Sequence, residues 1–137
     1  MELPPEPHAQ PRPDQKLGRQ RRLTATRDFQ ETYAQGRSWR GRVMVLWLRS
    51  GEGVALRLGV VASRKVGGAV QRARAKRRLR SVYRLHRDRL QGPYDVVLIA
   101  RYGMPYAPWR IVVEDLLQLA RKAGILAAPQ KESERNA

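Results

Sequence analysis

The chain has 137 residues, which is enough for one domain with a modest core and too few for two full domains. Lysine and arginine outnumber aspartate and glutamate by 28 to 12, and the formal net charge of +16 indicates a polyanionic partner. The hydrophobic fraction of 42% excludes a wholly disordered basic protein, and the absence of cysteine excludes disulfides and a thiol nucleophile.

The two ends of the chain are polar and show no hydrophobic period. Prolines are concentrated in the first thirteen residues, so residues 1–20 are expected to form a flexible Pro-rich extension. Residues 127–137 are expected to be a polar tail, which leaves residues 21–126 for the folded domain. Neither a long apolar run nor the layout of a signal peptide occurs, so we expect a cytoplasmic protein without a membrane span.

The first half of the domain predicts one helix followed by strands. Thr24 or Thr26 can cap a short helix that Gly36 ends, and this helix would carry Phe29 and Tyr33 on one face. Two β-rich runs follow at 43–49 and 54–62, and the Gly-containing segment between them predicts an antiparallel hairpin. A further short strand is possible between residues 39 and 42.

The second half predicts two helices around one buried strand. A long helix should begin after Gly68 and run to about Leu90, with an apolar stripe made of Ala75, Leu79, Val82, His86 and Leu90. The opposite side of this helix is predicted to carry Arg74, Arg77, Arg78, Ser81 and Arg84. A strand at 94–100 and a helix at 108–123 complete the order α-β-β-α-β-α, with a possible extra strand, which favours a small two-layer α/β sandwich.

The long helix concentrates positive charge. Between Arg64 and Arg89 there are eleven basic residues and a single acid, Asp88. A solvated helix face normally carries acids that pair with its cations at i,i+4 spacing, and here those acids are missing. We therefore favour a polyanion-binding helix over a merely solvated one. The segment 64–68 before the helix could also present backbone N–H groups to a phosphate, although its glycines could simply make the turn.

The sequence offers little for catalysis. Its acids show no metal-binding motif, and His86 lies on the apolar stripe, where a core or interface role is favoured. The aromatic side chains Phe29, Tyr33 and Trp47 are either core residues or a surface on which single-stranded bases stack.

The segment from Lys65 to Arg80 resembles the signature of the bacterial ribonuclease P protein component. The matching positions are Lys65, Gly67, Ala69, Val70, Arg72, Arg74, Lys76, Arg77 and Arg80. Ala73 departs from the asparagine that is usual in that family, which removes one hydrogen-bonding side chain. Segments around Phe29, Trp47 and the strand at 94–100 also resemble the family, so the resemblance covers about residues 21–125.

The resemblance implies an α+β fold, a small two-layer α/β sandwich of order α-β-β-β-α-β-α. The family has a left-handed crossover through the basic helix, whereas general topology rules predict a right-handed one. The implied function is that of the protein subunit of an endoribonuclease that removes the 5′ leader of precursor tRNA. The RNA subunit would carry out hydrolysis with Mg²⁺ that RNA and substrate hold.

The resemblance also implies which residues contact each RNA. The catalytic RNA would be bound by Arg64, Lys65, Arg72, Arg74, Lys76, Arg77, Arg78, Arg80 and Arg84. Phe29, Tyr33 and Trp47 would line a cleft for the single-stranded leader, with Met44, Leu46 and Leu48 on the core side of the strand. No catalytic or metal-binding residue, membrane or obligate protein partner is expected.

Two alternatives belong to other functional classes. A ribosomal-type RNA-binding protein or RNA chaperone would explain the charge without a role in cleavage. A cationic membrane-active protein would explain the charge alone, but the apolar stripe is too mild to favour it.

Overall fold

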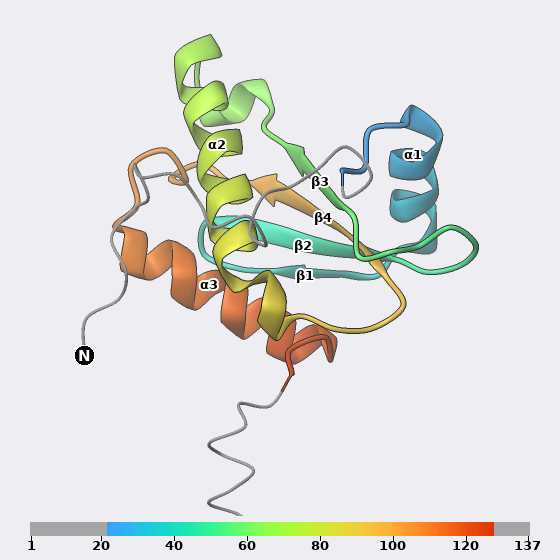
Figure 1. Cartoon of the computed structure of the whole chain (residues 1–137). Coiled ribbons are helices and arrows are strands. Elements are labelled where there is room, and N and C mark those ends of the chain that lie inside the picture. Colours follow the sequence, from blue (N-terminus) through green and yellow to red (C-terminus); the bar gives the residue numbers. More distant parts are fainter. Residues whose placement is uncertain (1–21, 128–137) are drawn as a thin grey trace, which may run out of the picture.

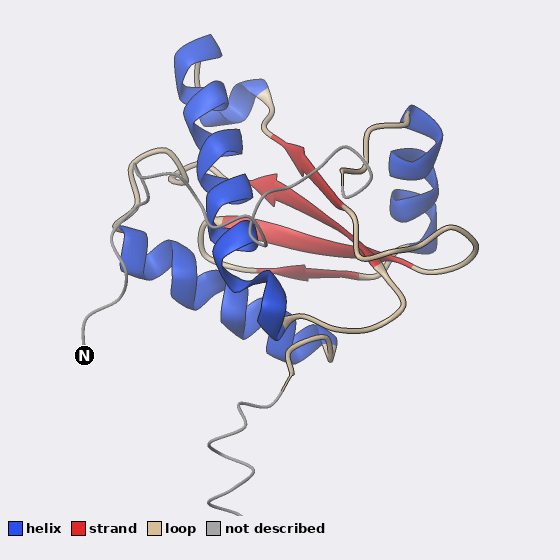
Figure 2. Ribbon diagram, in the orientation of Figure 1, coloured by secondary structure: helices blue, strands red, loops and turns tan. Residues whose placement is uncertain are grey.

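The computed structural model describes residues 22–127, which form a four-stranded sheet with helices on both faces (Figures 1 and 2). The elements in chain order are α1 (Thr26–Gln35), β1 (Ser38–Arg40), β2 (Met44–Arg49), β3 (Leu58–Val61), the 3₁₀ turn η3 (Arg64–Val66), α2 (Ala69–His86), the 3₁₀ turn η4 (Arg87–Arg89), β4 (Asp95–Ala100) and α3 (Trp109–Ala123). The extension expected at 1–20 and all but the first residue of the tail expected at 127–137 lie outside the described residues. The α+β class and the extra strand are confirmed.

The sheet has the order β1-β2-β4-β3, so the predicted hairpin between the second and third strands is wrong. β2 pairs antiparallel with β1 and with β4, while β3 pairs only with β4 and runs parallel to it. β4 takes the central place because it is apolar on both faces: Val96, Val97 and Leu98 are fully buried. The need to bury both faces of β4 therefore decides the strand order, and it outweighs the local turn signal that predicted a hairpin of β2 and β3.

The connection from β3 through α2 to β4 joins two parallel neighbours. In Figure 1 both strands run toward the left, β3 lies above β4, and α2 lies in front of the sheet. This arrangement is the left-handed crossover that the family resemblance implies, and the general expectation of a right-handed crossover fails here.

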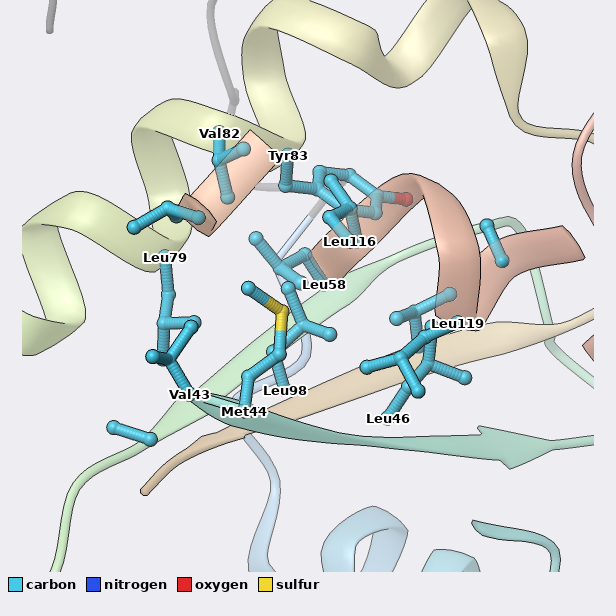
Figure 3. Close-up of a cluster of buried hydrophobic side chains, with 14 of the residues drawn as sticks. Val43, Met44, Leu46, Leu58, Leu79, Val82, Tyr83, Leu98, Leu116 and Leu119 are labelled. Atoms are coloured by element: carbon cyan, nitrogen blue, oxygen red, sulfur yellow. The ribbon is translucent and has the colours of Figure 1, made fainter. Parts of the chain in front are cut away.

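The core lies between the sheet and the pair formed by α2 and α3. The alternate residues Met44, Leu46 and Leu48 of β2 are fully buried and belong to this core. Figure 3 shows Met44 and Leu46 pointing from the strand toward the helices. α2 contributes Leu79 and Val82 to the core, as the apolar stripe predicts. Further core residues come from α3. The intervening β2 residues therefore face the other side of the sheet, where α1 packs.

The helix ends follow the glycine signals. Gly36 and Gly124 adopt φ values of 67° and 80° after α1 and α3, and these left-handed conformations end both helices. The end of α1 at Gly36 and the end of α3 at residue 123 agree with the prediction. The predicted threonine cap of α1 is wrong, because Ala25 occupies the N-cap position and no side chain caps this helix.

The turn between β1 and β2 is attached to α3 by a single carboxylate. Buried Asp115 accepts hydrogen bonds from the backbone N–H groups of Arg42, Val43 and Met44 at 2.8, 2.9 and 3.2 Å. Gly41 lies directly against this carboxylate, and a Cβ atom at that position would collide with it. Because Gly41 has no side chain, the carboxylate of Asp115 can occupy the space beside it.

Candidate nucleic-acid interface

α2 begins at the N-cap Gly68, directly after Gly67, whose φ of 145° favours glycine. Its buried side consists of Ala75, Leu79, Val82 and Tyr83, which are inaccessible to solvent. Tyr83, which the predicted stripe omits, donates a hydrogen bond from its hydroxyl to the backbone oxygen of Leu56 at 2.9 Å. Burial raises the pKa of this tyrosine, so the hydroxyl stays protonated and acts as a donor.

Arg78 does not lie on the exposed side of α2, where the helical pattern places it. It is only 2% exposed. Its guanidinium donates hydrogen bonds of 2.6 Å to the backbone oxygens of Met104 and Ala107, and it lies over the ring of Trp109 at 5.7 Å. The prediction of an exposed Arg78 is therefore wrong, because the loop between β4 and α3 covers a second flank of α2.

Two further residues from the predicted exposed side also differ from the pattern. Arg74 is half-buried, and its Nε donates a 2.6 Å hydrogen bond to the backbone oxygen of Pro105 in the same loop. Ser81 is buried at 6% exposure. Arg74 and Arg78 thus hold the loop between β4 and α3 against α2, in addition to carrying charge.

The remaining cations of the predicted RNA-binding set are accessible to solvent. Exposed side chains are Arg64, Lys65, Arg77 and Arg80, while Arg72, Lys76 and Arg84 are half-buried. We call these seven residues the basic surface. Within the described part of the chain none of them forms an ion pair with an acid. The structure therefore brings together a row of cations that no acid within residues 22–127 neutralises.

The electrostatics of the basic surface favour an anion. Partial burial lowers the pKa of Arg80, and the positive charge of Arg22 lowers it further. Partial burial likewise lowers the pKa of Arg84. Both arginines remain protonated at neutral pH, so a bound phosphate would relieve the cost of keeping these charges close together and partly desolvated.

The turn before α2 presents cations from a fixed backbone. Val66 is buried and holds the turn to the core, while the two preceding residues, Arg64 and Lys65, are exposed to solvent. The Ser63 hydroxyl accepts a 3.3 Å hydrogen bond from the backbone N–H of Lys65, which helps to fix the turn. The segment therefore places two cations next to the first turn of the basic helix.

The predicted aromatic residues gather on the opposite side of the sheet from α2. Tyr33 of α1 and Trp47 of β2 make an edge-to-face contact with ring centroids 5.1 Å apart. Phe29, one turn earlier in α1, packs over Gly59 of β3, where a Cβ atom would lie 2.6 Å from Cζ of the phenylalanine ring. We call Phe29, Tyr33 and Trp47 the aromatic surface; Tyr33 is 38% exposed and the other two are half-buried.

An ion cluster beside the aromatic surface was missed by sequence reasoning. Fully buried Asp95 pairs with Arg49 at 2.8 Å and with Arg57 at 2.7 Å, and Asp28 of α1 lies 3.5 Å from Arg49. Burial alone would raise the pKa of Asp95, but hydrogen bonds from Arg57 and from two backbone N–H groups lower it overall. The cluster attaches α1 to the sheet. The four residues are far apart in the sequence, so no local pattern could have revealed it.

The described residues offer no obvious catalytic centre. Among residues 22–127 no group of three His, Cys, Asp or Glu side chains could hold a metal ion. His86 is half-buried, and its Nδ1 lies 2.8 Å from the backbone oxygen of Val82 in its own helix. No helix in the described part of the chain is long and apolar enough to cross a membrane.

Comparisons with known proteins point to one family. The model of the ribonuclease P family matches residues 17–124. The ribonuclease P protein component of Symbiobacterium thermophilum is 43% identical over 109 residues, covering 77% of this chain and 92% of the relative. That of Chloroflexus aurantiacus is 37% identical over 113 residues, covering 82% and 84%.

Solved structures agree with the sequence comparison. The Staphylococcus aureus RNase P protein superimposes with a TM-score of 0.68 at 26% identity, covering 77% of this chain and 97% of that one. The Thermotoga maritima RNase P protein gives a TM-score of 0.65 at 30% identity, covering 74% and 96%.

Proposed function

This chain belongs to the ribonuclease P protein family, and we propose that its two surfaces hold two different RNAs. It is the protein component of a ribonucleoprotein endoribonuclease that processes tRNA. In this proposal the basic surface binds the ribonuclease P RNA, and the aromatic surface binds the single-stranded 5′ leader of precursor tRNA. The observation that carries the proposal is the placement of the two surfaces on opposite faces of one sheet.

The basic surface suits a structured RNA. Its cations lie on one rigid helix and the turn before it, and they lack acidic partners among the described residues. Each arginine or lysine that neutralises a phosphate releases counterions from the RNA. The free energy of this release would supply much of the affinity for the RNA, and the affinity would fall as the salt concentration rises. Five of the seven cations are arginines, whose planar guanidinium groups can bind phosphate oxygens in pairs.

The aromatic surface suits a single strand. Unpaired bases stack on flat side chains regardless of sequence, whereas duplex RNA hides its bases. A mature tRNA lacks the leader, so contacts at this surface would favour the precursor over the product. The protein would thereby retain substrate and release product while contributing no group to the hydrolysis itself.

The residues present do not fit a metal centre held by the protein. The buried acids Asp28 and Asp95 are paired with Arg49 and Arg57, and no group of three His, Cys, Asp or Glu side chains within residues 22–127 could hold a metal ion. The Mg²⁺ that the family's reaction requires is therefore proposed to be held by the RNA subunit and the substrate.

The matches to ribonuclease P proteins do not favour the alternative of a ribosomal RNA-binding protein or chaperone. The proposed site of action is the cytoplasm.

Reconstitution tests this function. The full chain is assembled with ribonuclease P RNA, and cleavage of precursor tRNA is compared with that by the RNA alone at low Mg²⁺. We expect the protein to increase cleavage and an excess of ribosomal RNA not to compete. Cleavage that does not respond to the protein would contradict the proposal.

A further inference from the structure

The loop between β4 and α3, residues 101–108, exposes two tyrosines. Tyr102 is 82% exposed and Tyr106 is 71% exposed, although large apolar side chains are otherwise mostly covered in this domain. Val70, in the first turn of α2 and one turn before Arg74 on the same side, is 77% exposed. Exposed apolar groups that gather in one region of a small protein usually mark a binding surface.

The loop is held firmly despite this exposure. Met104 is fully buried and Pro105 is buried beside it. Arg74 and Arg78 of α2 donate three 2.6 Å hydrogen bonds to backbone oxygens of Pro105, Met104 and Ala107. The tyrosines therefore project from an anchored backbone, so that binding through them would cost little conformational entropy.

The charge around the loop fits a polyanion. Arg101 begins the loop and has no acid paired with it among the described residues, whereas Arg110, just after the loop, forms an exposed i,i+4 pair with Glu114 at 3.8 Å. The loop is attached to α2 through Arg74 and Arg78, so it continues the same side of the molecule as the basic helix. In Figure 1 this loop lies at the left of the sheet, and α1 lies at the right.

From this arrangement we propose that Tyr102 and Tyr106 stack on unpaired nucleotides of the ribonuclease P RNA that α2 binds. The inference rests on the proposed function and adds a second mode of contact to it. Phosphates would be neutralised along α2, while bases that are not paired in the RNA would rest on the two phenol rings. Arg74 and Arg78 act as positioning residues, because they fix the loop from beneath rather than touching the bases.

The test compares two double variants of the full chain. Tyr102→Ser with Tyr106→Ser removes both rings, and Tyr102→Phe with Tyr106→Phe keeps the rings and removes only the hydroxyls. Equilibrium affinity for ribonuclease P RNA is measured for both variants and the wild type at several salt concentrations. Both tyrosine side chains are exposed, so equal melting temperatures serve as the check on folding.

The serine variant is expected to bind the RNA about fivefold to 150-fold more weakly per stacked base. Its dependence on salt should be unchanged, because no phosphate contact is lost. The phenylalanine variant should bind like the wild type. Ultraviolet crosslinking of the wild-type complex should attach a nucleotide of this RNA to Tyr102 or Tyr106.

Three results would overturn the inference. The first is a serine variant that binds the RNA like the wild type and a wild type without crosslinks in the loop. The second is a loss confined to precursor tRNA, which would make the loop a substrate contact. The third is a change in self-association with RNA affinity intact, which would make it a protein contact. If the wild type itself failed to bind ribonuclease P RNA, the proposed function would fall as well, so the two failures can be told apart.

Discussion

At the scale of single residues, one carboxylate organises the turn between β1 and β2. Asp115 reaches from α3 to three successive backbone N–H groups, of which those of Val43 and Met44 are buried and that of Arg42 is partly buried. Hydrogen bonds to a charged group are stronger than neutral ones, and a buried donor without a partner is costly. This side chain therefore matters for stability although it lies outside both proposed RNA surfaces.

Asp115→Ala should lower the free energy of unfolding by about 3 kcal/mol, since three backbone donors lose their acceptor. Asp115→Asn keeps one side-chain oxygen and should cost less. Denaturant titration of both variants provides the measurement. An alanine variant as stable as the wild type would show that water satisfies these donors equally well.

The buried Asp95 predicts how stability responds to acid. Its pKa is lower in the folded protein than in the unfolded chain, so the stability it contributes is complete above its ordinary pKa near 3.8. That contribution is lost as the pH falls through the lower folded pKa. Denaturant unfolding at pH 7 and at several values below 4 should show the loss in the wild type. Asp95→Asn should be less stable at pH 7 and should show a shallower decline below pH 4; equal declines would contradict this role.

Leu79 tests which side of α2 faces the core. It is fully buried, as the helical pattern predicts. Leu79→Ala should reduce stability by about 2–5 kcal/mol and lower the melting temperature. The measurement compares the melting temperatures of Leu79→Ala and Arg77→Ala, because Arg77 is an exposed position on the same helix. Equal melting temperatures would mean that α2 is rotated relative to this structure.

At the scale of elements, α2 has two kinds of arginine that the sequence does not distinguish. Arg77 and Arg80 are exposed, whereas Arg78 between them is buried against loop carbonyls. Exposed arginines should contribute to RNA affinity through counterion release, and the buried one should contribute to folding.

Arg77→Ala combined with Arg80→Ala should reduce the salt slope of RNA affinity by about 1–2 units, at about 0.7–0.9 per phosphate contact. Its melting temperature should stay close to that of the wild type. Arg78→Ala should instead lose about 2–3 kcal/mol of stability, because two buried carbonyl groups lose their donor. An unchanged slope in the folded double variant would remove this surface from the interface.

The same distinction shows how far sequence reasoning reaches. Local signals located α1, α2 and α3 and the glycine ends of α1 and α3, because helix period and left-handed caps depend on neighbouring residues. The sequence predicts the end of α2 near Leu90, but this helix ends at His86 and continues as the 3₁₀ turn η4. The position of β3 could not be predicted in this way, since its partner β4 lies more than thirty residues away and is chosen by burial. The placement of Arg78 failed for the same reason, because the loop that covers it comes later in the chain.

At the scale of the whole molecule, the sheet separates two chemistries. The face toward α2 and α3 carries the core and, beyond it, the basic surface. The face toward α1 carries Tyr33 and Trp47 in contact, with Phe29 beside them over Gly59. The family resemblance predicted both groups of residues, and the structure brings the three aromatic residues to one face. The ion cluster that fixes α1 to the sheet became visible only in three dimensions.

The central claim is that this domain holds the RNA subunit on one surface and the leader of the substrate on the other. Phe29→Leu combined with Tyr33→Leu removes two flat rings from α1 while keeping apolar side chains that suit a helix. The complex reconstituted with ribonuclease P RNA is titrated at equilibrium with precursor tRNA and with mature tRNA. We expect the variant to assemble normally, to lose affinity for the precursor by about 1–3 kcal/mol per stacked base, and to bind mature tRNA like the wild type. Equal losses for both tRNAs, or a wild-type complex without preference for the precursor, would contradict the account.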